Sequence, residues 1–249
     1  MRWITTLPVA AFATLALTAC GGNTGDGGPA KVRPATGKGA APASRVIATL
    51  GDSIVAGSPQ WDPDKSVRDG FPSVDENSQW QRTVQALPPA DLRNCGAWGE
   101  RTDQIAGRFD TCAKGADAIV IQGGINDIVQ GRPVKDAARD LGCLVDRAIA
   151  ADLPVAIADV LPWNNGYPDA APEIRDLNKR IHAIAKARGI PTLPFFGTLE
   201  DPKAKDRLRV TLTIEGDHPN VAGYRLIGRE AWREPETGTI PTGAPNCDQ

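Results

Sequence analysis

The sequence predicts a three-layer α/β/α sandwich around a mostly parallel sheet of about five strands. Short apolar runs that end at Gly or Pro alternate along the chain with amphipathic segments of helical period. This alternation is typical of parallel sheets that helices cover on both faces. The length of 249 residues suits one such domain with additional tail.

Five segments are expected to form the strands. Each is short and apolar or β-branched, and turn residues follow it. In chain order they are 46–50, 91–95, 118–122, 155–161 and 191–196. In parallel sheets, sites lie at the carboxyl ends of the strands, so the residues that follow these segments are the first place to look for chemistry.

Two long helices are expected between the later strands. Apolar residues recur on one helical face over 133–151, and Pro133 suits the first turn. A similar stripe runs over 170–188, where Gly189 supplies a C-terminal stop. A last helix should follow Asn220 and run to about residue 233.

The N-terminal residues 1–19 have the features of a signal peptide. A short positive start precedes an apolar stretch that is too short to span a bilayer comfortably. The stretch ends in Leu17-Thr18-Ala19-Cys20-Gly21, which resembles a bacterial lipoprotein cleavage box. We therefore expect lipidation of Cys20 and anchoring to the outer face of the cell membrane; the alternative is a plain secretory signal and a secreted protein. Residues 20–43, rich in Gly, Ala and Pro, read as a flexible tether before a folded domain over 44–249.

Composition narrows the partners and the redox chemistry. A net charge of −2 argues against a nucleic-acid partner, because phosphate binding requires a basic face. With Cys20 set aside, four cysteines remain in an exported chain, so two disulfides are expected. Three connectivities are open; spacing suggests Cys95 with Cys112, which would leave Cys143 for Cys247. The cysteines lack CxxC spacing, so no metal site is expected.

Polar residues gather at four stations along the chain, three of them directly after expected strands. The stations are Gly51-Asp52-Ser53-Ile54, Asn94-Cys95-Gly96-Ala97-Trp98-Gly99-Glu100-Arg101-Thr102, Gly123-Gly124-Ile125-Asn126-Asp127 and Glu215-Gly216-Asp217-His218-Pro219-Asn220, the last followed by Gly223-Tyr224. A serine needs a base to become an effective nucleophile, and histidine titrates near neutrality. Ser53 and His218 therefore form a candidate nucleophile and base.

In this order, the four stations resemble the sequence blocks of the SGNH (GDSL-type) hydrolase superfamily, over about residues 45–233. The resemblance implies a flavodoxin-like fold, Ser53 as nucleophile and His218 as base. It also implies an oxyanion hole formed by the backbone N–H groups of Ser53 and Gly99 and the side-chain amide of Asn126. Glycine at position 99 is expected because a Cβ would obstruct the approach of backbone to substrate.

The sequence departs from the family at the third catalytic position. The family usually carries Asp three residues before the histidine, and this chain has Glu215 there. Glutamate is able to orient an imidazole, and some serine hydrolases use it. Asp217 adjoins His218 in the chain and is not expected to reach back to its ring. We favour Glu215 as the orienting residue; the alternative is a Ser–His dyad with a backbone carbonyl in that role.

Four tryptophans, Trp61, Trp80, Trp98 and Trp163, fall in or near expected loops at the site edge. Trp98 and Trp163 follow strand ends and are the candidates for substrate walls, although local packing would explain them equally well.

The expected activity is hydrolysis of short acyl or aryl carboxylic esters through an acyl-enzyme, without metal or cofactor. The alternatives are O-deacetylation of cell-wall or plant polysaccharide, and a non-catalytic binding lipoprotein that keeps the fold. A monomer is expected.

Overall fold

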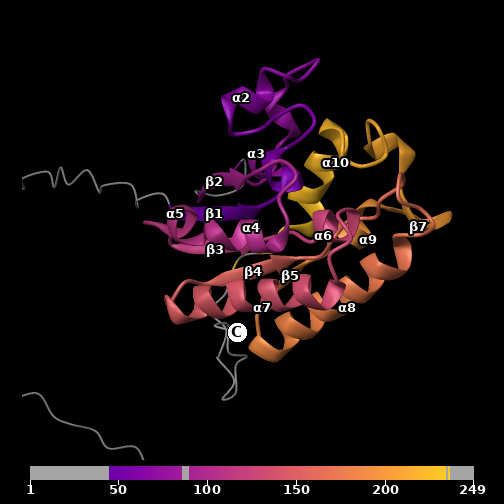
Figure 1. Ribbon diagram of the computed structural model, residues 1–249. Coiled ribbons are helices and arrows are strands. Elements are labelled where there is room, and N and C mark those ends of the chain that lie inside the picture. Colours follow the sequence, from indigo (N-terminus) through magenta and orange to yellow (C-terminus); the bar gives the residue numbers. More distant parts are fainter. Residues whose placement is uncertain (1–44, 86–89, 234, 236–249) are drawn as a thin grey trace, which may run out of the picture. The chain divides into compact units, whose positions relative to one another are not determined.

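The computed structural model describes residues 45–85, 90–233 and 235. Its centre is a five-stranded parallel sheet in the order β2-β1-β3-β4-β5, shown in Figure 1. The strands are β1 (Arg45–Gly51), β2 (Ala90–Gly96), β3 (Ala118–Ile121), β4 (Val155–Ala158) and β5 (Thr192–Leu193). The predicted fold class is confirmed, because every pairing is parallel and helices cover the sheet on both faces.

Two layers of helices bury the faces of the sheet. One layer consists of α4 (Thr102–Gly107), α5 (Phe109–Ala113), α7 (Val134–Ala150) and α8 (Ala171–Arg188). The other consists of α1 (Ser53–Ala56), α3 (Trp80–Gln85), α9 (Phe195–Leu199) and α10 (Val221–Leu226). Strand side chains alternate between the two cores: Ala48 and Leu50 face the first layer and Ile47 faces the second.

Two strands, β4 and β5, are shorter than the sequence predicts. The side chain of Asn178 in α8 accepts from the N–H of Val160 at 2.7 Å and donates to its carbonyl at 2.8 Å. This exchange diverts the backbone beyond Ala158 from the ladder. Beyond β5, the chain turns at Pro194 into α9.

Several smaller elements outside the central sheet were not expected from the sequence. They include the antiparallel pair β6 (Glu200–Asp201) and β7 (Ala204–Leu208), the short helices η2 (Val210–Leu212) and α6 (Ile125–Val129), and a π-helical turn, η3 (Ile227–Ala231), that continues α10. The expected last helix is therefore regular only over its first part.

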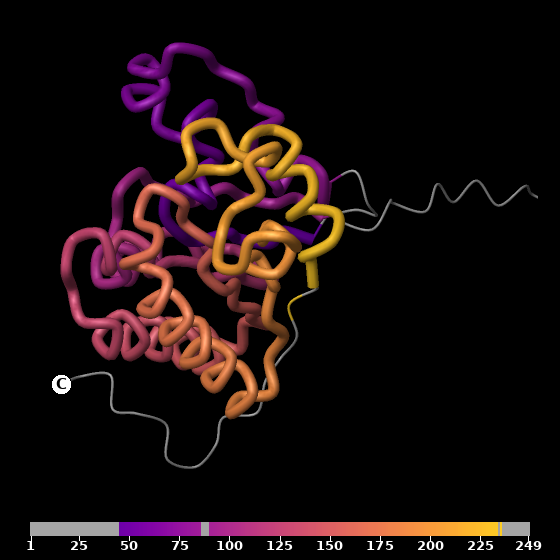
Figure 2. The backbone as a smooth tube through the Cα atoms, turned by 90° about the vertical axis from the view of Figure 1, so that its right-hand side faces the viewer, coloured from indigo at the N-terminus to yellow at the C-terminus, as the bar shows by residue number. Residues whose placement is uncertain are grey.

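The chain between α1 and α3 forms a projecting segment that contains α2 (Lys65–Arg68) and η1 (Glu76–Ser78). It stands out from the sheet at the top of the view in Figure 1 and again in Figure 2. Its base is fixed by two buried hydrogen bonds. Ser78 Oγ donates to the carbonyl of Gly57 at 2.6 Å, and the Tyr224 hydroxyl donates to the carbonyl of Ser58 at 2.7 Å.

A disulfide joins Cys95 at the end of β2 to Cys112 in α5, as predicted. The suggested partner of Cys143, Cys247, lies outside the described residues, as do the signal segment 1–19, Cys20 and the rest of the tether at 20–43. Within the described part of the chain, no helix is both long enough and apolar enough to cross a bilayer.

Candidate active site

Ser53 occupies the first position of α1, just beyond the end of strand β1. Asp52 caps this helix, since its carboxylate accepts from the backbone N–H of Ile54 at 2.9 Å. The turn is tight: a Cβ on Gly51 would lie 2.7 Å from the carbonyl oxygen of Gln122. Capping and crowding together hold the Ser53 hydroxyl at the carboxyl edge of the sheet.

His218 comes from a short loop near the end of the domain and meets Ser53 at that edge. Its Nε2 lies 3.0 Å from Ser53 Oγ, which is hydrogen-bonding distance. Its Nδ1 bonds the Glu215 carboxylate. An ionised carboxylate only accepts, so Nδ1 carries the proton and Nε2 is left to accept from the serine hydroxyl. Residues 165 positions apart in the chain thus form one continuous hydrogen-bonded series with Glu215.

The loop that carries His218 is held internally by Thr213. Its hydroxyl donates to the carbonyl of His218 at 2.7 Å and accepts from the N–H of Gly216 at 2.9 Å. Gly216 has φ +97°, a left-handed conformation that favours glycine.

Residues of the segment that follows β4 also hydrogen-bond to the loop that carries His218. The N–H of Asn164 donates to the carbonyl of Gly216 at 3.0 Å, and the Asn165 amide donates to the carbonyl of Glu215 at 2.9 Å. The Trp163 indole donates to the Asp217 carboxylate. Asp217 is therefore turned toward Trp163, and Glu215 is the residue on His218 Nδ1.

The two further candidate oxyanion donors lie on neighbouring segments: Gly99 in the loop before α4, and Asn126 in the first turn of α6. The Asn126 amide donates to the carbonyl of Glu100 at 3.0 Å, and its second N–H is left for another acceptor. Gly99 has φ +73°, but a Cβ built on it would meet nothing within 4 Å. The left-handed backbone conformation is itself a reason for glycine at this position. The expectation that a Cβ would obstruct the approach of backbone to substrate stays a prediction.

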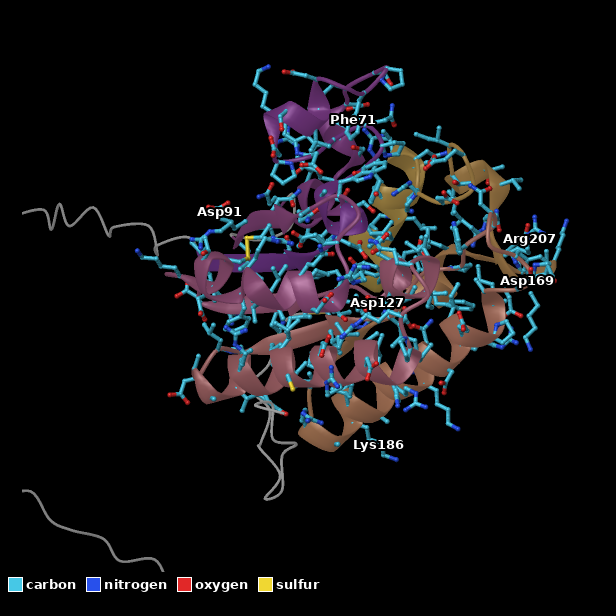
Figure 3. The ribbon with its side chains drawn as sticks, viewed as in Figure 1. Phe71, Asp91, Asp127, Asp169, Lys186 and Arg207 are labelled. Carbon is cyan, nitrogen blue, oxygen red and sulfur yellow. A yellow bond between two sulfur atoms is a disulfide. The ribbon has the colours of Figure 1, made fainter. Side chains whose placement is uncertain are left out.

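Asp127 braces the segment that carries Asn126 against the one that carries Gly99. It is fully buried and accepts from the backbone N–H and the hydroxyl of Thr102, both at 2.9 Å. Arg132 bonds it at 2.5 Å and also bonds Asp140. Figure 3 shows Asp127 at the middle of the molecule. Because Asp127 follows Asn126 directly, it links α6 to the start of α4, just beyond Gly99.

Replacing Asp127 by alanine should destabilise the protein by about 3 kcal/mol, because it leaves the buried Thr102 groups and part of the Arg132 charge without a partner. Chemical denaturation would measure the loss. Asp110→Ala is the matched control: Asp110 pairs with Arg147 at 2.9 Å, but its side chain is 88 % exposed, so this variant should change stability by less than about 1 kcal/mol. Equal losses in the two variants would contradict the bracing role.

Burial raises the pKa of Asp52 from 3.8 to about 6, although the hydrogen bonds from Ile54 and the Gln122 amide act in the opposite direction. The native carboxyl therefore binds its proton more tightly than the unfolded one. As the pH rises from about 4 to about 6, this group lowers the free energy of unfolding.

Replacing Asp52 by asparagine should remove that pH dependence. Relative to the wild type, the variant should gain on the order of 3 kcal/mol between pH 4 and pH 7, because only the wild type must ionise a buried carboxyl. Denaturation of both proteins at several pH values in this interval would measure the difference. A constant difference would show that Asp52 titrates at its usual pH.

The site opens into a cavity of about 180 Å³ with mainly apolar walls. We call it the chamber; it is lined by Ser53, Ile54, Trp98, Gly99, Ile125, Asn126, Val129, Leu161, Trp163, Asp217 and His218. The chamber thus brings together the candidate nucleophile, base, oxyanion donors and two substrate-wall tryptophans named from the sequence. Glu215 does not line the chamber but bonds His218 Nδ1. The sequence reasoning missed Asp217 as a wall residue, and also Ile125 and Val129. Their spacing of four on a helix would have placed these last two on one face.

The tryptophans take different places from one another. The Trp98 ring stacks on the His218 imidazole, with centroids 5.1 Å apart and planes inclined by 25°. Trp163 makes a polar contact instead: its indole N–H donates to the Asp217 carboxylate. Trp61 lies under Arg68 in the projecting segment, and Trp80 is fully buried in the core. The placement of Trp80 at the site edge was therefore wrong, because its ring packs against Phe195.

A serine at a strand end that is hydrogen-bonded through a histidine to a carboxylate is the arrangement found in hydrolases with a serine nucleophile. The sequence profile of the GDSL-like lipase/acylhydrolase family matches residues 49–226. The chain belongs to this family and hence to a family of hydrolytic enzymes.

Comparison with solved structures supports the same fold. A G-D-S-L family protein from Desulfitobacterium hafniense has a TM-score of 0.61 at 21 % identity, over 74 % of this chain and 95 % of its own. A G-D-S-L family member from Veillonella parvula has 0.60 at 22 %, over 74 % and 94 %. An acetylxylan esterase from Geobacillus stearothermophilus has 0.57 at 16 %, over 75 % and 91 %. No curated protein matches the chain significantly.

Proposed function

We propose that this chain is a serine esterase that hydrolyses short acyl or aryl carboxylic esters through an acyl-enzyme. The observation that carries the proposal is the 3.0 Å contact between His218 Nε2 and Ser53 Oγ, with Glu215 on Nδ1 of the same ring. This arrangement supplies a nucleophile, a base in the correct tautomer and a carboxylate that stabilises the imidazolium.

In the acylation step, Ser53 Oγ attacks the ester carbonyl as its proton passes to His218 Nε2. The carbonyl oxygen becomes an oxyanion and accepts from the N–H groups of Ser53 and Gly99 and from the Asn126 amide. The bond from carbon to the alcohol oxygen then breaks, and His218 gives its proton to that oxygen. Each oxyanion donor of this kind typically contributes about 3 kcal/mol to lowering the barrier.

In the deacylation step, a water attacks the acyl carbonyl as His218 takes its proton. The bond to Ser53 Oγ breaks, His218 returns the proton to the serine, and the acid leaves. No other group is required for proton balance. The Asp127 brace holds the segments that carry Gly99 and Asn126 in place before substrate arrives, so the donors need little reorganisation.

The chamber favours a small acyl group. Its volume of about 180 Å³ and its walls of Ile54, Ile125 and Leu161 suit a short apolar chain or one ring. The structural similarity to an acetylxylan esterase makes polysaccharide acetyl esters a second substrate class to assay.

Labelling by a fluorophosphonate probe tests the proposal directly. The wild type should react at Ser53, and Ser53→Ala should not react, because only an activated serine attacks phosphorus. A panel of p-nitrophenyl esters from acetate to laurate, with acetylated xylan beside it, should show the highest kcat/KM for the short chains. A fluorophosphonate-resistant wild type would favour the non-catalytic binding protein.

We further propose that the chain is exported and that Cys20 carries lipid. This rests on the sequence around Cys20. Full-length protein expressed in a bacterium should partition into the detergent phase of a Triton X-114 extract, and Cys20→Ser should move it to the aqueous phase. Equal partitioning of both proteins would indicate a plain secretory signal.

A further inference from the structure

We propose that the alcohol half of the preferred ester carries an ammonium group, recognised by Asp217, Trp163 and Trp98. This inference rests on the proposed esterase function, since it assigns a substrate class to the same chamber. Three features of the chamber carry it: an isolated carboxylate, two indole rings, and the position of both relative to His218.

Asp217 is the carboxylate in an otherwise mainly apolar wall. Among the described residues that line the chamber, none is Lys or Arg. The groups around Asp217 are the Trp163 and Asn165 donors, the Glu215 carboxylate and His218. The Trp163 indole occupies one carboxylate oxygen, which leaves acceptor capacity on the other.

Partial burial raises the pKa of Asp217, so its negative charge is incompletely compensated by the protein alone. A bound cation would supply that compensation, because charge-assisted contacts strengthen where water is excluded. An anionic group in the chamber would instead be repelled by the Asp217 carboxylate. The negative charge of Asp217 therefore favours a cationic ester over a neutral or anionic ester of the same shape.

The indole rings of Trp98 and Trp163 add to this preference. An indole face attracts a cation by its quadrupole, and aromatic walls are a recurring means of binding quaternary ammonium groups. Trp98 is 47 % exposed, so part of its ring is open to a ligand although it also stacks on His218. Phe71, from the projecting segment, packs against Trp98 with centroids 5.8 Å apart and fixes its orientation.

The position of Asp217 assigns the ammonium to the alcohol half. The leaving alcohol must lie near His218, because this residue protonates the departing oxygen. Asp217 precedes His218 directly in the chain and lines the same chamber. A positive group a few bonds beyond the alcohol oxygen therefore falls near this carboxylate, while the acyl group faces Ile125 and the Asn126 amide.

The adjoining groove is compatible with this charge preference. It shares Val129 and Trp163 with the chamber and carries two further carboxylates, Asp169 and Glu173. Arg207 lies over the Tyr167 ring, 4.5 Å from its centroid, and places one positive charge at the far end. Asp169 and Arg207 appear together at this end in Figure 3. The groove thus offers no excess of positive charge to an anionic alcohol.

Two acetate esters of the same shape test the proposal. Choline acetate carries a quaternary nitrogen where 3,3-dimethylbutyl acetate carries carbon, and both deliver the same acyl group. The wild type should hydrolyse the choline ester with a kcat/KM at least about tenfold higher. Asp217→Asn keeps the size of the side chain and an acceptor for Trp163, and should reduce this ratio to about twofold or less.

Asp91→Asn is the matched control, since Asp91 (labelled in Figure 3) lies near the amino end of β2, whereas the site lies at the carboxyl ends of the strands. It should leave the ratio unchanged. Equal kcat/KM for the two esters, both dependent on Ser53, would overturn the inference while the esterase function stands. If the wild type hydrolyses neither ester, both the inference and the proposed esterase function are overturned. A ratio that persists in Asp217→Asn would also overturn it.

If Asp217→Asn does not fold, the wild type supplies the comparison. Choline should inhibit hydrolysis of 3,3-dimethylbutyl acetate competitively, with an inhibition constant at least about tenfold lower than that of 3,3-dimethylbutanol. Equal inhibition by the two alcohols would contradict ammonium recognition independently of any variant.

Discussion

Replacing Ser53 or His218 by alanine should lower kcat for hydrolysis of p-nitrophenyl acetate by about 10⁴- to 10⁶-fold. Without the hydroxyl there is no acyl-enzyme, and without the imidazole the serine keeps its proton at neutral pH. The two losses should be nearly equal, and the double variant should lose little more, because the residues act as one unit. Steady-state kinetics on the purified variants would measure this.

The chain offers a matched control for each change. Ser66→Ala removes an exposed hydroxyl that bonds only Asp64 in α2, and His182→Ala removes the other histidine, which bonds Asp159 outside the chamber. Both should keep kcat within about twofold of the wild type. Full activity in either Ser53→Ala or His218→Ala would remove the hydrolase mechanism from these residues.

Replacing Glu215 by glutamine should lower kcat by up to about 10⁴-fold, with a smaller effect on KM. A neutral amide stabilises the imidazolium poorly, and its NH₂ group would also favour the wrong tautomer of His218. The measurement is kcat for a short p-nitrophenyl ester. Glu215→Asp should recover part of the activity, because it keeps the charge at a shorter reach.

Glu230→Gln is the control for this change, since Glu230 is exposed and pairs only with Arg229 at 3.4 Å. A loss below about tenfold in Glu215→Gln would favour a Ser–His dyad. The structure places no backbone carbonyl on Nδ1 among its described hydrogen bonds, and Glu215 occupies that position. The sequence alone left this choice open because reach depends on a loop conformation set by Thr213 and Gly216.

The sheet was predictable from the sequence because its strands are buried on both faces. Such strands carry continuous apolar runs such as Ala118–Ile121, and these are visible without tertiary information. The helix α8 was predictable to within one residue for a similar reason: its apolar stripe ends at Gly189, whose left-handed φ of 63° stops it.

The remaining features depend on long-range contacts that no local pattern records. β4 ends early because Asn178, eighteen or more residues away, bonds the backbone of Val160. Asp217 lines the chamber because Trp163 holds it there across 54 positions of sequence. The stations at the strand ends indicated which residues would converge, but not which carboxylate would face the imidazole and which the chamber.

The disulfide between Cys95 and Cys112 encloses the segment that carries Trp98 and Gly99 in a covalent ring with a sequence separation of 17. Closing such a ring raises the free energy of unfolding by about 3 kcal/mol, because it lowers the conformational entropy of the unfolded chain. Disulfides form and persist mainly in oxidising compartments and are rare in cytosolic proteins. We therefore expect the loop that carries Gly99 to reach its final rigidity only after the two cysteines are oxidised. A chain kept among cytosolic thiols would contain all the site residues. It would lack the Cys95–Cys112 bond that restrains the segment with Trp98 and Gly99.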